Sequence, residues 1–180
     1  MWEVVWRCFF LPTPKRLGNP WRICILRVFG ACITGDALVP GSCRILQPWK
    51  LTLGDGVAIG RQVEIYNYAP VSIGDMTVIS QYSYLCTGTH DYTDPHMPLT
   101  WAPIDIGPEC WVAAGVFIGP GVSIGHGTVV GARSVVTRDL AEWSVCAGNP
   151  CKRLKTRALN GVHKSQQTGV ERNSVVAEPQ

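Results

Sequence analysis

Apolar residues recur every six positions through most of this chain, and that spacing sharply limits the folds available to it. A period of six fits neither an amphipathic helix nor a long alternating strand. It is typical of a parallel β-helix, in which three short strands form one triangular coil and successive coils stack. The residues in phase are Ile33, Val39 and Ile45; Leu53, Ile59 and Ile65; Ile73, Ile79 and Leu85; and Ile106, Val112, Ile118, Ile124, Val130 and Val136.

The positions around these apolar residues repeat as well. Glycine often follows directly, as at Gly54 and Gly119, where it eases the turn at a corner. A small residue often stands four positions later, as at Cys43 and Thr128, and is expected to fill the narrow space inside the coil. A β-sandwich with chance spacing is the alternative, but six apolar residues in phase in the last run argue against it.

The pattern also divides the chain, whose 180 residues are the length of one domain. It predicts a helical cap over residues 1–32, a β-helix over 33–141 and a C-terminal segment over 142–159 with a short basic helix from Lys152 to Leu159. A proline-rich insertion at 91–105 interrupts the β-helix, and a long loop in a compact domain is usually functional. Residues 160–180 are polar without periodicity and are expected to be disordered.

Composition excludes several classes of protein. The net charge of +3 is small, and no Lys or Arg run interleaves with aromatic residues, so no nucleic-acid partner is expected. The eight cysteines form no CxxC pair; we interpret them as reduced thiols of a cytoplasmic protein and expect no metal. The apolar run Trp2–Phe10 is too short to span a bilayer. It could cap the open end of the β-helix or lie on a membrane surface, since tryptophan and arginine together favour interfaces.

His90 is the candidate catalytic residue. It ends one repeat immediately before the long insertion, and an imidazole with a pKa near ~6.5 can take a proton from a hydroxyl at neutral pH. The alternative is a strand-end histidine bonded to a backbone carbonyl. His126 is expected to face solvent at a corner, and His96 lies inside the insertion.

Several motifs over about residues 20–157 give the chain a family resemblance. They are Ile79-Ser-Gln-Tyr-Ser-Tyr-Leu-Cys-Thr-Gly-Thr-His-Asp-Tyr92, Pro48-Trp-Lys-Leu51, Leu26-Arg-Val-Phe-Gly-Ala31 and Ala147-Gly-Asn-Pro-Cys-Lys152. With them the chain resembles the left-handed β-helix (hexapeptide-repeat) acyltransferases, and within them the acetyltransferases of colanic-acid and other exopolysaccharide biosynthesis. The resemblance implies an all-β fold, a left-handed parallel β-helix, and a homotrimer with active sites between protomers.

The resemblance further implies acetyl-CoA as the donor and an O-acetyltransferase that transfers directly to a sugar hydroxyl, with His90 as general base. Carried over by position, small residues would admit the pantetheine arm and cations would meet the nucleotide phosphates. The donor set is Ala114, Ala132, Thr137, Arg138, Lys152 and Lys155. Related enzymes often carry serine where Ala114 stands, so a hydroxyl near the thioester is missing here. A solvated basic face is the alternative for Arg138, Lys152 and Lys155.

The acceptor side rests on aromatic rings beside polar groups, which suit a sugar but also suit packing between protomers. The candidates are Tyr66, Asn67, Asp91, Tyr92 and Trp101. A glycan, a lipid-linked sugar and a nucleotide sugar remain open as acceptors, and the N-terminal helices are candidates for peripheral membrane contact. Two other classes also remain: a zinc hydratase resembling γ-carbonic anhydrase, which needs three converging histidines, and a non-catalytic β-helix scaffold.

Overall fold

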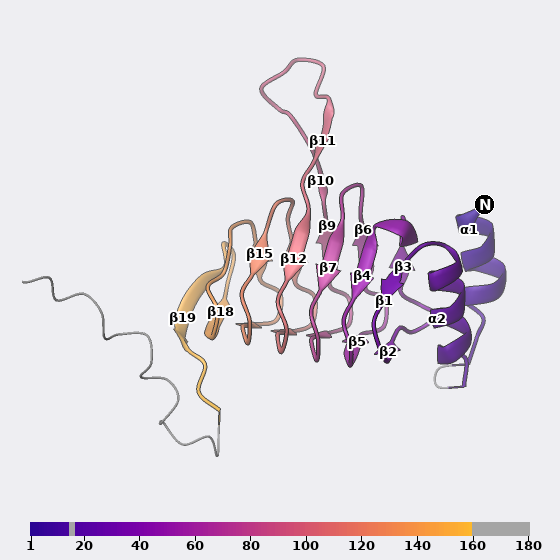
Figure 1. Ribbon diagram of the computed structural model, residues 1–180. Helices are drawn as coiled ribbons and strands as arrows, with labels where there is room; N and C mark the ends of the chain where they lie inside the picture. The colour runs from indigo at the N-terminus through magenta and orange to yellow at the C-terminus, as the bar shows by residue number, and fades with distance from the viewer. Residues whose placement is uncertain (15–16, 160–180) are drawn as a thin grey trace, which may run out of the picture.

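The chain forms a three-sided prism of stacked coils, with two helical segments across one end and a long hairpin projecting from one corner (Figure 1). This computed structural model describes residues 1–14 and 17–159. The predicted tail at 160–180 therefore lies outside the described residues. Strands on all three sides pair in parallel with the equivalent strand of the next coil. The prediction of a parallel β-helix is confirmed.

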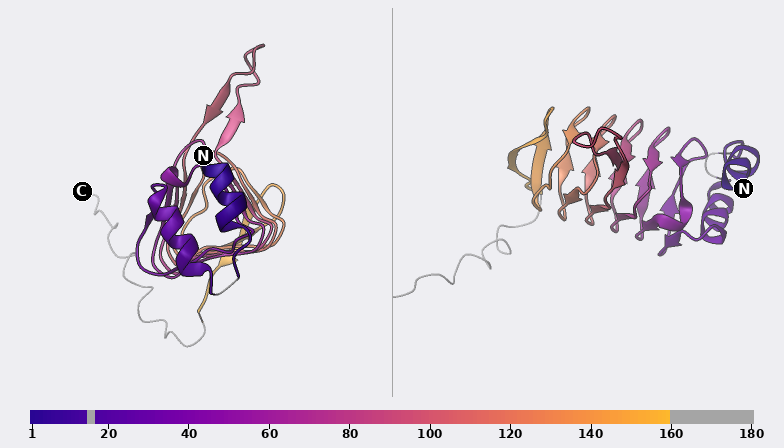
Figure 2. Two further views of the ribbon diagram at one scale, coloured as in Figure 1. Left: turned by 90° about the vertical axis from the view of Figure 1, so that its right-hand side faces the viewer. Right: turned by 90° about the horizontal axis from the view of Figure 1, so that it is seen from above.

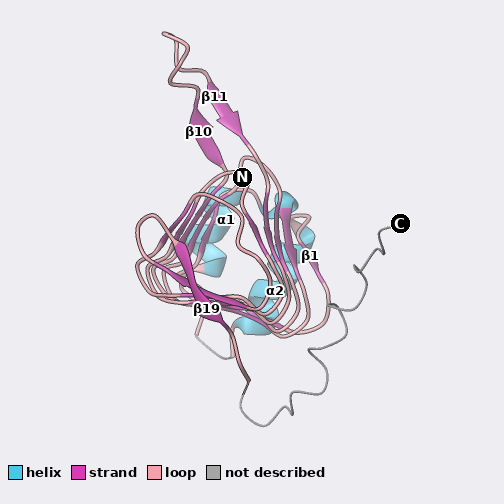
Figure 3. Ribbon diagram, turned by 90° about the vertical axis from the view of Figure 1, so that its left-hand side faces the viewer, coloured by secondary structure: helices cyan, strands magenta, loops and turns pink. Residues whose placement is uncertain are grey.

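Each side of the prism is one sheet, and Figure 3 shows the three sides in a view along the coils. Face A consists of β1 (Cys32–Ile33), β4 (Leu51–Leu53), β7 (Val71–Ile73), β12 (Ile104–Ile106) and β15 (Ser123–Ile124). Face B consists of β2 (Ala37–Leu38), β5 (Val57–Ile59), β8 (Val78–Ile79), β13 (Trp111–Val112), β16 (Val129–Val130), β18 (Ser144–Ala147) and β19 (Lys152–Thr156). Face C consists of β3 (Arg44–Ile45), β6 (Glu64–Tyr66), β9 (Tyr84–Cys86), β14 (Phe117–Ile118) and β17 (Val135–Val136).

The core is the stack of apolar side chains that the six-residue period identifies. Leu53, Ile73 and Ile106 lie in register on face A, and all three are at most 3% exposed. Each coil buries its inner residues only against the coils above and below it. Stability is therefore close to a sum over neighbouring coils.

The spacing between coils locates the insertion. Ile106 and Ile124, which pair on face A, are 18 residues apart, or three units of six. Ile73 and Ile106 are 33 apart, so this coil holds 15 more residues. The excursion differs from the expected bounds of 91–105: it begins at β10 (Gly88–His90) and returns through β11 (Leu99–Trp101). Ile104 is fully buried in β12, because its side chain continues the core of the coil.

The N-terminal cap contains α1 (Trp2–Val5), a short π-helix η1 (Trp6–Phe10) and α2 (Asn19–Val28), and it covers the first coil (Figure 2). An uncovered coil would leave backbone groups without partners. Here side chains satisfy them: Trp2 Nε1 donates to the carbonyl of Ile45 at 2.6 Å, and the fully buried Arg22 donates through Nε to the carbonyl of Val39 at 2.6 Å. A further short helix, η2 (Pro48–Lys50), forms a corner between β3 and β4.

The C-terminal segment is not helical as predicted. The chain reverses after β18 at Gly148, whose φ is +108°, and returns as β19, antiparallel to β18. The physical reason is that β18 ends the stack on face B, and its open edge needs hydrogen-bond partners. A strand supplies them along its whole length, whereas a helix of the same residues would leave the edge open.

Candidate functional site

His90 lies at the end of β10, on the exposed hairpin that leaves the prism between face C and face A (Figure 1). Its Nδ1 is 2.6 Å from the backbone carbonyl of Met97. Because a carbonyl oxygen only accepts, Nδ1 carries the proton in this contact, and the neutral ring keeps its lone pair on Nε2. The strand-end histidine bonded to a carbonyl is therefore also the arrangement that prepares a base.

The turn at the hairpin tip sets the position of that carbonyl. Met97 adopts a left-handed backbone conformation, with φ of 42°, and its N–H donates to the carbonyl of Asp94 at 2.9 Å. A non-glycine residue in this region is strained, so the turn must be held by its contacts. The carbonyl oxygen that orients His90 is thus positioned by a locally strained backbone at Met97.

The remaining hairpin candidates differ in what they offer. Asp91 accepts hydrogen bonds from the hydroxyl and the backbone N–H of Thr93, at 2.6 and 2.9 Å, and these bonds hold the pKa of its carboxyl below the usual value. Tyr92 is 87% exposed. Trp101 is half exposed and stacks on Tyr68 with ring centroids 6.4 Å apart. The two rings form an aromatic surface at the base of the hairpin.

Asn67 does not present its amide to solvent. Its side chain is fully buried, with Oδ1 accepting from the N–H of Gln47 at 2.9 Å and Nδ2 donating to the carbonyl of Gln47 at 2.8 Å. These bonds join the corners of two successive coils. Within one chain, Asn67 was predicted to bind an acceptor but instead links two successive coils.

Aromatic rings form a ladder up the outer side of face C. Tyr66, Tyr84 and Phe117 occupy successive coils, with centroid separations of 6.3 and 5.8 Å, and each is half-buried. The Tyr66 hydroxyl is 3.4 Å from that of Tyr68, and this hydrogen bond, with burial, raises the pKa of Tyr66. Burial likewise raises the pKa of Tyr84. The phenols stay neutral, and the ladder is a mainly apolar surface.

The small residues of the expected donor site lie at the corner between face B and face C. Ala114 lines a hollow of about 300 Å³ together with Tyr82, Gly115 and Arg133. Ala132 occupies the equivalent corner of the next coil, and the N–H of Arg133 donates to the carbonyl of Ala114 at 2.9 Å. Lys152 and Lys155 extend from β19, exposed, at the end of face B. Sequence reasoning missed Arg133, a cation beside Ala114, because nothing local distinguishes it from other corner residues.

Thr137 and Arg138 lie elsewhere. They follow β17 and are exposed at the corner between face C and face A, the corner from which the hairpin leaves. The width of face C separates this corner from Ala114. Within one chain, the expected donor residues are therefore divided between two corners, and His90 shares a corner with only two of them.

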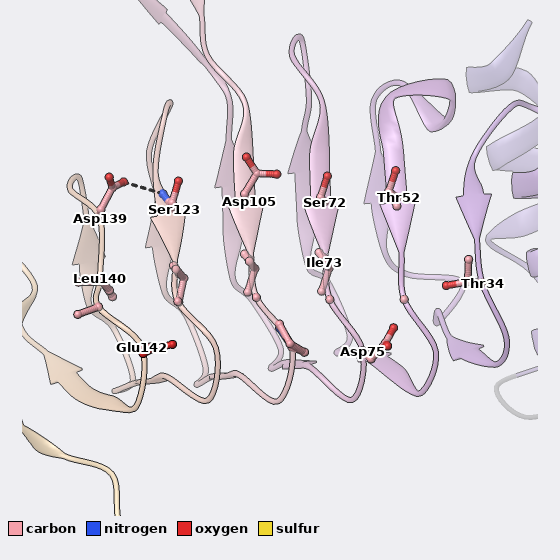
Figure 4. A pocket seen from close by; sticks show the side chains of 18 residues that line it. Thr34, Thr52, Ser72, Ile73, Asp75, Asp105, Ser123, Asp139, Leu140 and Glu142 are labelled. Atoms are coloured by element: carbon pink, nitrogen blue, oxygen red, sulfur yellow. Dashed lines mark hydrogen bonds between the residues drawn. The ribbon is translucent and has the colours of Figure 1, made fainter. Parts of the chain in front are cut away.

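A shallow groove of about 970 Å³ runs across face A, and its lining includes none of the predicted site residues. Figure 4 shows Thr52, Ser72, Asp105 and Ser123 pointing outward from successive coils of this face. The carboxylate of Asp139 accepts from the N–H of Ser123 at 2.8 Å. We interpret the groove as the flat polar side of the prism.

The histidines do not converge as a zinc hydratase requires. His96 contacts Asp94 at 3.2 Å in the hairpin, whereas His126 lies at the corner between face A and face B, 3.5 Å from Glu109 and against the ring of Trp143. Over residues 1–14 and 17–159, no three His, Cys, Asp or Glu residues are grouped to hold a metal ion. All eight cysteines are free. No described helix is long and apolar enough to cross a membrane.

Comparison with known proteins gives consistent matches. The family model described as bacterial transferase hexapeptide (six repeats) matches residues 103–138. "Putative colanic acid biosynthesis acetyltransferase WcaF" of Escherichia coli is 45% identical over 157 residues, which are 87% of this chain and 86% of that protein.

Two solved structures share the fold. A maltose O-acetyltransferase from Clostridium difficile superposes with a TM-score of 0.75 at 25% identity, covering 87% of this chain and 84% of that one. A hexapeptide-repeat acetyltransferase from Vibrio cholerae, solved with acetyl coenzyme A, gives a TM-score of 0.78 at 24% identity, covering 85% and 84%.

Proposed function

The chain belongs to the hexapeptide-repeat acetyltransferases, and on that premise we propose that it transfers the acetyl group of acetyl-CoA to a sugar hydroxyl of a glycan or exopolysaccharide precursor. The observation that carries the proposal is the bond between His90 Nδ1 and the Met97 carbonyl, at 2.6 Å. It supports an imidazole whose ring is oriented by Nδ1 and whose Nε2 is left for a proton acceptor role.

The transfer proceeds in one step without an acyl-enzyme. His90 Nε2 takes the proton of the sugar hydroxyl while the oxygen attacks the thioester carbonyl. The C–S bond breaks, and the leaving thiolate takes the proton back from the imidazolium. The products are an acetylated sugar and free CoA. A backbone N–H at a corner of the β-helix supplies a donor for the oxyanion.

A homotrimer completes the site in this proposal. His90 and the Ala114 corner lie on opposite sides of face C, so one protomer offers each half of a site to a different neighbour. The half-buried ladder of Tyr66, Tyr84 and Phe117 supports face C as the contact surface, because apolar side chains are stabilised by burial. Three such contacts close a ring.

The donor would lie along the corner between face B and face C. Ala114 and Ala132 leave room for the pantetheine arm, and Lys152, Lys155 and the newly identified Arg133 offer cations for the phosphates. In the trimer, Thr137 and Arg138 would approach the same donor from the neighbouring protomer. The aromatic surface of Trp101 and Tyr68 supports a sugar acceptor beside His90. A cytoplasmic location fits the free cysteines.

An acetyl-transfer assay tests this function. The full-length protein is incubated with acetyl-CoA and a panel of glycans, nucleotide sugars and lipid-linked sugars, and CoA release is followed by thiol titration. We expect release that depends on a sugar acceptor, and mass spectrometry should find an ester on that sugar. Acetylation of an amine only, or turnover that requires added zinc, would contradict the proposal.

A further inference from the structure

The outer surface of the N-terminal cap is unusually apolar. We define the cap surface as the exposed residues Val4, Phe9, Leu11, Leu17, Trp21 and Val28, which are between 44% and 89% exposed. The inner sides of the same helices are already buried on the first coil through Trp2, Phe10 and Leu26. The cap is therefore apolar on both sides, whereas a cap that served only the coil would be polar outside.

Part of the cap surface is joined across the two helical segments. Trp21 and Val28 are seven residues apart on α2, so they lie on one side of that helix. Trp21 Nε1 donates to the carbonyl of Phe9 at 2.9 Å, which joins the surface of α2 to that of η1. The two helical segments lie side by side across the end of the prism (Figure 2). A flat end of this kind can rest on a plane.

The cap also carries net positive charge. Residues 1–30 hold five of the sixteen Lys and Arg and one of the thirteen Asp and Glu, a net charge of +4. The whole chain carries +3, so residues 31–180 carry −1. The Arg7 side chain is 69% exposed and lies 3.2 Å from the carboxylate of Glu3, and the exposed Arg27 donates to the backbone carbonyl of Ile33 at 3.0 Å. A second copy docked end to end would bring like charges together, whereas an anionic surface would attract them.

We infer that the cap surface binds the surface of an anionic lipid bilayer. Trp21 and Phe9 would enter the headgroup region, where aromatic rings are favoured, and the basic residues would pair with lipid phosphates. The helices lie on the membrane without crossing it, in keeping with their lengths of four to ten residues. The inference is independent of the proposed chemistry, since none of the residues used by the transfer belongs to the cap.

Vesicle flotation tests the inference on the full-length chain. One set of vesicles contains phosphatidylglycerol and phosphatidylcholine, and the other phosphatidylcholine alone. We expect the protein to float with the anionic vesicles and to be partly released by salt, because the attraction is screened. The inference would be overturned if the protein floated with neither set of vesicles. It would also be overturned if the protein floated equally with both sets at low and at high salt.

A charge-matched pair of variants locates the contact. Val4→Asp with Leu17→Asp adds two acids to the cap surface, each near the start of a helix, where a negative charge is tolerated. It should reduce partitioning at least about tenfold, through lost apolar contact and repulsion. The control, Met76→Asp with Leu159→Asp, adds the same charge at exposed residues outside the cap and should float as the parent does. An equal loss in both variants would overturn the inference.

A measurement on the unmodified cap covers the case in which the acidic variant fails to fold. Bromine-labelled anionic lipids quench tryptophans that enter the headgroup region, and Trp21 is half exposed. We expect quenching in the parent and much less in Trp21→Phe. Equal quenching in both, or assembly into larger particles without lipid that Trp21→Phe abolishes, would assign the surface to another occupant and overturn the proposal.

Discussion

At the scale of residues, His90 is distinguished by the backbone carbonyl that its ring nitrogen Nδ1 contacts. Its neighbour in the hairpin, His96, is also exposed but contacts a carboxylate, Asp94, rather than a carbonyl. The two exposed histidines therefore differ in their hydrogen-bond partners. That difference makes His96 a matched control for any experiment on His90.

Substitution of His90 should remove the base and little else. We expect His90→Ala to lower kcat at least about 100-fold, the lower end of what a general base contributes, with little change in the KM for acetyl-CoA. His96→Ala should retain most of the activity. Steady-state kinetics with the best acceptor measure both, and near-parental turnover of His90→Ala would remove it from the mechanism.

The buried thiol of Cys43 leads to a prediction about the stability of the folded protein at alkaline pH. Burial, with the nearby negative charge of Glu64, raises the pKa of this thiol from its ordinary value of 9.0 to about 12. A group whose pKa is raised in the folded state contributes its full stability at pH values below its pKa in the unfolded chain. For Cys43 that contribution is lost as the pH rises from 9 toward 12.

The free energy of unfolding should therefore fall through this range more steeply in the parent than in Cys43→Ala, by up to about 1.4 kcal/mol per pH unit. Chemical denaturation at several pH values measures the free energy of unfolding of both proteins. The difference between the two proteins is free of the titration of all other groups. Cys24→Ala, at an exposed thiol, should follow the parent. If the free energy of unfolding fell equally in the parent and in Cys43→Ala, the pKa of the Cys43 thiol would not be raised in the folded state.

At the scale of elements, the core of the prism does not depend on the hairpin of β10 and β11. Ile104 and Leu85 remain in the core on either side of it, and residues 91–97 contribute no buried side chain. The hairpin can therefore change length without opening a coil. Its prolines and its two-stranded ladder indicate a preformed wall rather than a mobile lid.

Replacement of residues 91–97 by an Asn-Gly turn should leave the fold intact and disable transfer. We expect a melting temperature close to the parent's, binding of CoA by calorimetry, and acetyl transfer reduced at least about 100-fold, because His90 loses the carbonyl of Met97. Full activity would show that the hairpin tip has no part in the reaction. Loss of folding would show instead that the hairpin belongs to the core.

At the scale of the whole molecule, the separation of His90 from the Ala114 corner leads to the trimer prediction. Light scattering at micromolar concentration should give three times the mass of the chain. Phe117→Lys, on the aromatic ladder of face C, should yield monomers without activity, because burial of a lysine without a partner is costly. Thr52→Lys, on the polar face A, should remain trimeric and active. A stable parental monomer would count against the shared site, and dissociation of Thr52→Lys alone would move the contact to face A.

The sequence by itself determined the coil, because the period of six is a local property that each unit repeats. Ile73, Ile106 and Ile124 could be assigned to the core, and 15 inserted residues counted, without knowing any distant contact. His90 stood out for the same reason, as the residue at which the repeat stops. The fold and the candidate residue His90 were thus accessible from spacing alone.

Tertiary structure decided what depends on partners far apart in the chain. Residues 152–156 became a strand because the edge of β18 was open, and Asn67 became buried because Gln47, a coil away, offered it both a donor and an acceptor. Likewise, only the closed prism puts Ala114 and Arg138 at different corners. Such outcomes follow from which backbone groups remain unsatisfied after the coils have stacked, and no local pattern in the sequence records that.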